Sequence, residues 1–184
     1  MKTRDVVIYT GKRFEVPQGI QRIDTQATHG WQLRYGGTKL FSDGAQNAKG
    51  ASEALVQATR ELLSRIARLP APSLLQREPN ENKTSDLPVG ISGPIGRQRR
   101  GSKVLESSLS VSLPRFGAAS RRRSVYIGTE NTYTTERYHL ALAKCIALRE
   151  AAEKVYQREA TAAKRAGALK LQVRQARRLG AVQA

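Results

Sequence analysis

Arginine is the residue type whose clustering in this sequence most clearly indicates a chemistry. Arg121, Arg122 and Arg123 follow one another, and basic residues also gather at positions 97–103, just before a run of alternating serines. Guanidinium and ammonium groups contact phosphates and release the counterions condensed on a nucleic acid, which raises affinity without selecting a base sequence. The clusters therefore predict contact with a polyanion, and a solvated basic loop is the alternative.

The charge of the whole chain agrees with a polyanionic partner. The 184 residues include 32 Lys and Arg against 15 Asp and Glu, a formal net charge of +17 with a pI of about 10.8. Residues 87–184 alone carry 19 basic and 6 acidic residues. A positive field of this strength attracts nucleic acid, and it argues against an ordinary enzyme of small-molecule metabolism. We expect a nucleic-acid partner, most simply duplex DNA, and no membrane partner.

The residue types that usually perform catalysis are too scattered to predict an active site. His29 and His139 stand far apart, and Cys145 is the only cysteine, on an apolar helical stretch where burial explains it better than nucleophilic chemistry. No GxxxxGK[ST] phosphate loop, nucleophile elbow or metal-ligand spacing occurs. We predict a protein that is not an enzyme and that has no metal site and no cofactor.

The compartment is predicted from what the sequence lacks. No stretch of about 18 apolar residues occurs, and the first residues have no apolar signal core behind them. A single cysteine excludes an intrachain disulfide, which suits a reducing environment. We expect a soluble protein that is not secreted, cytoplasmic, and located on the nucleoid if the source is bacterial.

The elements that must position the basic residues are predicted from the hydrophobic pattern, in which a period of two gives way to a period of 3.6 twice along the chain. Short strands are predicted at 19–23, 30–35 and 38–41, and a helix with an apolar face at 52–66. Two glycines, Gly36 and Gly37, separate the second and third strands and predict a two-residue hairpin turn.

The same order of elements returns in the second half of the chain. The second copy begins at 87–91, which parallels 16–20 of the first copy, and its second and third strands are predicted at 108–113 and 124–129, followed by a helix that opens near Thr134. The connection between the last two strands is a long basic loop that contains Arg121, Arg122 and Arg123. The predicted class is α+β, with two small modules, each a three-stranded antiparallel sheet packed on one amphipathic helix.

The domain boundaries follow from the same pattern. We predict an N-terminal strand or arm at 1–15, a first module at 16–70, a polar, proline-bearing linker at 71–86, a second module at 87–156 and a basic helical tail at 157–184. Gly167 interrupts the helical pattern of the tail, which holds seven basic residues and one acidic residue. Two interpretations of the tail remain open: a solvated helical extension, and a segment that orders on a phosphate backbone.

This succession of elements resembles the DNA-binding domain of the plant ethylene-response-factor (apetala-two) family, which also occurs in phage and bacterial proteins. The resemblance covers roughly residues 16–69 and 87–156, and its motifs are short. The matching stretches are Gly19-Ile20, Gly30-Trp31-Gln32-Leu33-Arg34, Gly90-Ile91, Val125-Tyr126-Ile127-Gly128-Thr129 and Ala141-Leu142-Ala143.

The resemblance implies that the sheet face turned away from the helix lies in the DNA major groove. With a two-residue turn, strand alternation directs Trp31, Leu33, Tyr35 and Leu40 toward the helix. The residues predicted on the outer face of the first sheet are Gln32, Arg34, Lys39 and Phe41. Arginine pairs bidentately with guanine and glutamine with adenine, so this face is a candidate for base recognition. An ordinary solvent-exposed strand face is the alternative, with Phe41 in the core.

The second module departs from the family because serines replace the arginines and tryptophans that the family places on this face. Alternation predicts Ser108, Ser110, Ser112, Ser124 and Tyr126 on the outer face. Hydroxyl groups bond to phosphates or bases but supply no charge. The candidate phosphate contacts are Arg97, Arg99, Arg100, Lys103, Arg121, Arg122 and Arg123.

Three functions fit these observations. The first is a DNA-binding protein, a transcriptional or genome-architectural regulator that lays sheet faces on duplex DNA. The second is an RNA-binding or ribosome-associated basic protein, which would recognise shape and phosphates. The third is a relative of the arm-binding domains of phage integrases, which share the three-strand-plus-helix plan and act enzymatically only with a catalytic domain.

Overall fold

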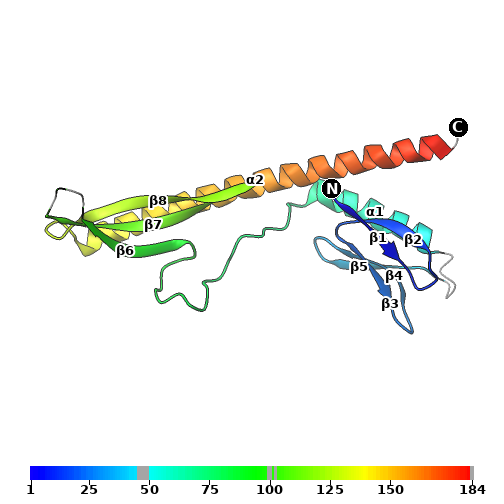
Figure 1. The fold of residues 1–184 in the computed structure, drawn as a ribbon, viewed down its shortest axis with the longest axis horizontal. Coiled ribbons are helices and arrows are strands. Elements are labelled where there is room, and N and C mark those ends of the chain that lie inside the picture. Colours follow the sequence, from blue (N-terminus) through cyan, green and yellow to red (C-terminus); the bar gives the residue numbers. More distant parts are fainter. Residues whose placement is uncertain (45–49, 99–100, 102, 183–184) are drawn as a thin grey trace. The chain divides into compact units, whose positions relative to one another are not determined.

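The computed structural model describes residues 1–44, 50–98, 101 and 103–182. Its contacts divide the chain into two compact units, one made of Met1–Pro72 with Thr161–Ala184 and the other of Ser73–Ala160. The predicted α+β class is confirmed, because helices accompany antiparallel sheets in both units (Figure 1). Among the described residues, no sheet contains strands of both units.

The first unit has two sheets and one complete helix. Strands β1 and β2 form a two-stranded hairpin, and β3, β4 and β5 form a three-stranded antiparallel sheet in that order. The bounds are β1 (Thr3–Val7), β2 (Arg13–Pro17), β3 (Ile20–Asp24), β4 (His29–Arg34), β5 (Thr38–Ser42) and α1 (Ala51–Arg68). The segment predicted as a strand or arm therefore forms a hairpin of its own, and its side chains enter the core of this unit.

Trp31 is the centre of the first core. Its side chain is fully buried, its indole N–H donates to the Ala51 carbonyl at 2.8 Å, and its ring meets the edge of Phe14. Ala51, Ala54 and Ala58 of α1 are buried as well. Small residues at helical spacing let the helix approach the sheet closely enough for a large ring to fill the space between them.

The turn between β4 and β5 is one residue longer than predicted. Arg34 pairs with Thr38, so the loop comprises Tyr35, Gly36 and Gly37. Both glycines have positive φ, at 61° and 103°, and the Arg65 guanidinium of α1 donates to the Tyr35 and Gly37 carbonyls at 2.9 and 2.8 Å. Because side chains alternate along a strand, this one-residue change reverses the face of every β5 side chain.

The second unit contains one sheet and the first part of a long helix. Strands β6 (Ile91–Gln98), β7 (Leu105–Arg115) and β8 (Ala118–Thr129) are antiparallel in that order, and α2 runs over Thr135–Val182. The last two strands are longer than predicted, and only Phe116 and Gly117 separate them. The prediction that Arg121, Arg122 and Arg123 lie in a hairpin loop is therefore wrong, because all three belong to β8.

The second core repeats the plan of a sheet face against a helix. Leu109 and Val111 of the central strand are fully buried, and they share a cluster with Ala141 and Cys145 of α2. Burial raises the pKa of the Cys145 thiol, which agrees with the predicted structural role of that residue. Arg149 of α2 pairs with Glu153 at 2.9 Å and donates to the Ser112 carbonyl at 2.7 Å, which ties the helix to the sheet.

Helix α2 continues through Gly167, so the predicted interruption there is wrong. From Thr161 onward its residues belong to the first unit, where Ala168 and Leu171 are buried and Arg174 pairs with Glu15 at 2.5 Å. The spacing of three residues between the two buried positions places them on one helix face. This part of the predicted tail thus packs as an element of the first unit.

Arg22 forms a charged cluster at the edge of the first core. Its guanidinium lies 4.9 Å from the Trp31 ring centroid and contacts Asp24 and Asp43 at 2.7 and 2.6 Å. Burial raises the pKa of Asp24, but hydrogen bonds from Arg22 and His29 outweigh that effect and hold the pKa below its ordinary value of 3.8. A carboxylate with a lowered pKa stabilises the fold only while it is ionised.

Acid should therefore weaken the first unit through Asp24. The stabilisation is complete above the ordinary pKa of an aspartate and disappears as the pH falls through the lower pKa of the folded state. Urea unfolding followed by the fluorescence of Trp31, the only tryptophan, should show a midpoint that falls between about pH 5 and about pH 2, and Asp24→Asn should flatten that dependence. Asp5→Asn, which removes an exposed carboxylate, is the control and should leave the pH dependence of the midpoint unchanged. Equal curves for the two variants would contradict the stabilising role of Asp24.

Gly90 should be intolerant of any side chain. Its φ is 76°, and a Cβ there would overlap the Arg149 guanidinium. Gly117 has a φ of 70° with open space around it, so Gly117→Ala incurs only the backbone penalty, about 1–2 kcal/mol. Gly90→Ala should cost roughly 1 kcal/mol more, because it also displaces the Arg149 hydrogen bond. The stability of both variants can be measured from the reactivity of the buried Cys145 thiol in increasing urea. An equal loss of stability in the two variants would contradict the proposed clash with Arg149.

Candidate nucleic-acid interface

The first outer face is the side of sheet β3–β5 that is turned away from α1. Gln32 lies between Gln21 and Leu40 in register, and Arg34 lies opposite Thr38. The Arg34 Nε donates to the Gln32 side-chain oxygen at 2.5 Å, which leaves the terminal nitrogens of the guanidinium free for a ligand. The predicted positions of Gln32 and Arg34 on this face agree with the observed register.

Lys39 and Phe41 do not share that face, and their predicted position is wrong. Phe41 is opposite Trp31 and packs against the first core, and Lys39 is opposite Leu33 with its ammonium 5.1 Å from the Phe41 ring centroid. The cause is the three-residue loop described above. Leu40 takes their place on the first outer face, where 43% of it is exposed. The hydrophobic pattern could not distinguish the two registers of β5, because Leu40 and Phe41 are both apolar and either one could face the helix.

The second outer face is the corresponding side of sheet β6–β8, and its hydroxyl groups are arranged in rows. Across β7 and β8, Ser108 pairs with Tyr126, Ser110 with Ser124 and Ser112 with Arg122. This register confirms that the predicted serines and Tyr126 share one face. Tyr126 is 55% exposed. Strand β6 adds to the same face three residues that the prediction did not place there: Ser92, Ile95 and Arg97.

The three consecutive arginines of β8 divide between the two sides of the sheet. Arg122 belongs to the second outer face, whereas Arg121 and Arg123 lie opposite Leu113 and Val111 on the other side. All three are exposed, and within the described part of the chain no guanidinium group of the three has a hydrogen-bond or ion-pair partner.

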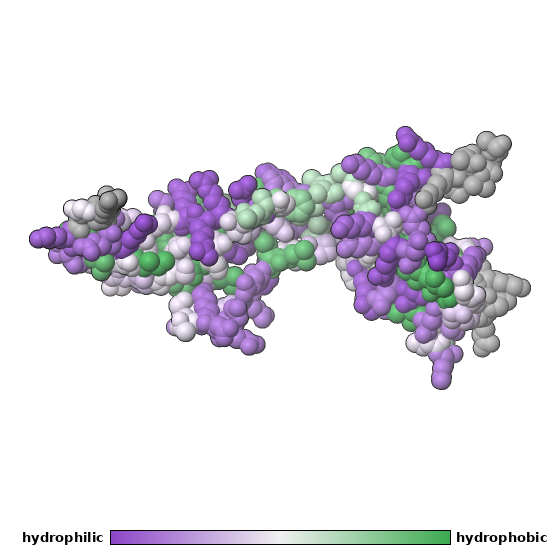
Figure 2. All heavy atoms as spheres, viewed as in Figure 1, coloured by the Kyte–Doolittle hydropathy of each residue, from purple (hydrophilic) through white to green (hydrophobic). Residues whose placement is uncertain are grey.

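The remaining predicted phosphate contacts precede β7. Lys103 is exposed, beside the start of that strand, and Arg97 is exposed near the end of β6. Arg99 and Arg100 lie outside the described residues. Figure 2 shows hydrophilic residues over both units in the face that it presents, with a paler apolar stretch along the alanine-rich middle of α2.

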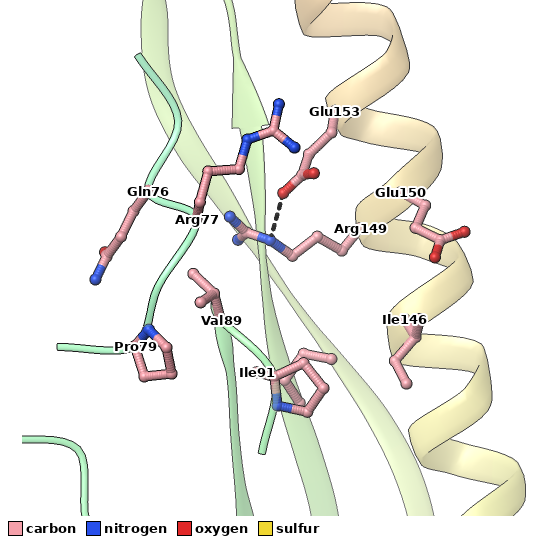
Figure 3. A pocket seen from close by; sticks show the side chains of 10 residues that line it. Gln76, Arg77, Pro79, Val89, Ile91, Ile146, Arg149, Glu150 and Glu153 are labelled. Atoms are coloured by element: carbon pink, nitrogen blue, oxygen red, sulfur yellow. Dashed lines mark hydrogen bonds and ion pairs between the residues drawn. The ribbon is translucent and has the colours of Figure 1, made fainter. Parts of the chain in front are cut away.

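A hollow of about 370 Å³ lies beside α2 in the second unit (Figure 3). Apolar side chains, including Val89, Ile91 and Ile146, line it together with charged ones. Arg149 and Glu153 face each other there and form an ion pair, and Arg149 also holds the Ser112 carbonyl. Arg149 is thus engaged in holding the helix to the sheet, and Glu153 in pairing with Arg149.

The described residues contain no group of three His, Cys, Asp or Glu side chains able to hold a metal ion. No described helix combines the length and the apolar character that crossing a bilayer requires. No family model, curated protein or solved structure matches the chain. The proposal for function therefore rests on the geometry and charge of the two outer faces.

The register of β5 can be checked by two neighbouring substitutions. Phe41→Ala removes a partly buried ring from the first core and should lower the free energy of unfolding by about 1–3 kcal/mol, less than for a fully buried ring. Leu40→Ala removes an exposed side chain and should change it by less than about 0.5 kcal/mol. Urea unfolding monitored by Trp31 fluorescence gives both values. A larger loss for Leu40→Ala than for Phe41→Ala would contradict the observed register and favour the two-residue turn.

Proposed function

We propose that this protein binds duplex DNA through the outer faces of its two three-stranded sheets and performs no catalysis. The observation that carries the proposal is the exposed Arg122 of β8, whose side chain has no partner among the described residues and lies on the second outer face beside the serine hydroxyl groups. Arg121 and Arg123, also exposed, flank it on the other side of the same strand. Transcriptional regulation or genome architecture is the corresponding biological role.

The arginines of β8 contrast with those that the fold itself uses. Arg22, Arg65 and Arg149 each contact a carboxylate at 2.6–2.9 Å, and Arg65 and Arg149 also hold carbonyl groups. No such partner within the described residues engages Arg121, Arg122 or Arg123. Three adjacent like charges repel one another, so they favour a bound polyanion that offsets the repulsion.

The two outer faces offer different contacts. On the first, Gln32 and Arg34 have the side-chain types that pair bidentately with adenine and guanine. On the second, serine hydroxyls and Tyr126 suit hydrogen bonds to phosphates or bases, and Arg122 supplies positive charge on the same face. The first face therefore favours base recognition and the second favours affinity for the backbone.

Corresponding contacts within the two units support descent from one repeated module. Gly19 and Gly90 both have positive φ, and the carbonyl of each accepts a hydrogen bond at 2.7 Å from the middle strand of its sheet, from the N–H of Arg34 and of Ser112 respectively. In both sheets the isoleucine after that glycine pairs with an apolar residue of the middle strand. We extend the proposal to tandem modules of the ethylene-response-factor type.

The test is a salt series of binding constants for duplex DNA, single-stranded DNA and duplex RNA of equal length. Duplex DNA should bind most tightly at physiological salt. Replacing Arg121, Arg122 and Arg123 together by Gln should weaken binding to all duplexes and reduce the slope of log K against log salt by up to about 0.9 for each lost phosphate contact.

The matched control replaces three exposed basic residues of α2 in the same unit, Lys144, Lys154 and Arg158, by Gln. It removes the same charge away from β8 and should change the slope less. Equal slopes in the two variants would mean that net charge alone drives binding. A preference for duplex RNA would replace the proposal with the RNA-binding alternative.

A further inference from the structure

A hollow of about 390 Å³ in the first unit lies beside the edge strand β3, where the start of β1 meets the turn between β2 and β3. Three cationic side chains line it, those of Lys2, Arg4 and Arg34, together with the side-chain amides of Gln18 and Gln21. None of its lining residues is acidic. The hollow is thus a positively charged recess with additional hydrogen-bond donors.

Backbone hydrogen bonds bring these residues together from distant parts of the sequence. The Gln18 N–H donates to the Lys2 carbonyl at 3.0 Å, and the Arg34 N–H donates to the Gly19 carbonyl at 2.7 Å. The Arg4 guanidinium donates to the Ile20 carbonyl at 3.3 Å. The cations are therefore held at one place by the β1–β2 hairpin and the end of β4.

The nearby carboxylates do not cancel this charge. Glu15 of β2 accepts from the Thr3 hydroxyl at 2.7 Å and pairs with Arg174 at 2.5 Å. Asp5 lies opposite Glu15 in the register, on the face of the hairpin away from Arg4. Within the described residues, the Lys2 ammonium has no partner. The donors of the recess that remain free are the Lys2 ammonium, the side-chain amides of Gln18 and Gln21, and most of the N–H groups of Arg4 and Arg34.

We propose that this recess binds a phosphate group, specifically a phosphodiester of the nucleic-acid backbone; the inference rests on the proposed function. Guanidinium forks match the oxygens of a phosphate, and an ammonium adds a point charge. Arg34 and Gln21 belong both to the recess and to the first outer face. A strand whose bases lie against that face has its backbone at the edge of the sheet, so the recess anchors it there.

The test compares two double variants of the same hairpin in the full chain. Lys2→Gln with Arg4→Gln removes two charges from the recess, and the control, Lys12→Gln with Arg13→Gln, removes two exposed charges from the other end. The recess variant should reduce the slope of log K against log salt for duplex DNA by up to about 1.8, and the control should change it less. Unfolding in urea followed by Trp31 fluorescence verifies that both variants remain folded.

Inorganic phosphate is the second probe and separates the two sources of a phosphate group. Added to the ¹⁵N-labelled chain at constant ionic strength, it should shift the amide signals of residues 2–4 and 18–21 only weakly, whereas a short duplex should shift them at micromolar concentration. If free phosphate shifts them strongly while the recess variant leaves the duplex slope unchanged, the backbone contact is wrong.

Equal slopes for the recess variant and its control would also overturn the inference while leaving DNA binding by the β8 arginines intact. If the unmodified chain binds no duplex, the proposed function itself fails, and the inferred backbone contact fails with it. The two failures are distinguished by the binding of the unmodified chain.

Discussion

Each three-stranded sheet of this protein must bury one face against a helix, and the rest of the structure depends on that constraint. Trp31 packs against alanines of α1 in the first unit, and Leu109 and Val111 pack with Ala141 and Cys145 of α2 in the second. A module with three strands and one helix has no second layer for the opposite sheet face. Among the described residues, no second helix or sheet layer therefore covers the two outer faces.

The basic residues serve two purposes that net charge alone does not distinguish. Arg22, Arg65 and Arg149 satisfy carboxylates and carbonyl groups at points where a strand or a turn must be held to its neighbours. Arg122 and its neighbours on β8 have no comparable task in the described part of the chain. A buried or partly buried arginine needs such partners, whereas an exposed one retains its donors for a ligand, and this difference selects the candidate interface.

The end of α2 shows how packing decides the fate of a basic segment. Its sequence is rich in alanine and positive charge, which suits a solvated helix as well as a packed one. Leu171 is only 3% exposed, and Arg174 reaches Glu15. The Arg174 contact needs the β1–β2 hairpin, and the position of that hairpin beside the helix is set by tertiary packing and not by helical propensity.

The sequence by itself determined the α+β class, the order of the strands, α1, the alternation of serines with apolar residues in β7 and the burial of Cys145, because these depend on local periodicity. Tertiary structure decided the loop of Tyr35, Gly36 and Gly37, which moved Lys39 and Phe41 to the helix side of the sheet. It also extended β8 to include Arg121, Arg122 and Arg123, and it assembled Lys2, Arg4 and Arg34 around one recess. The face of a side chain and the length of a strand depend on strand pairing and turn length. A short apolar strand can shift its register by one residue with almost no change in its hydrophobic pattern, so the sequence does not reveal the shift.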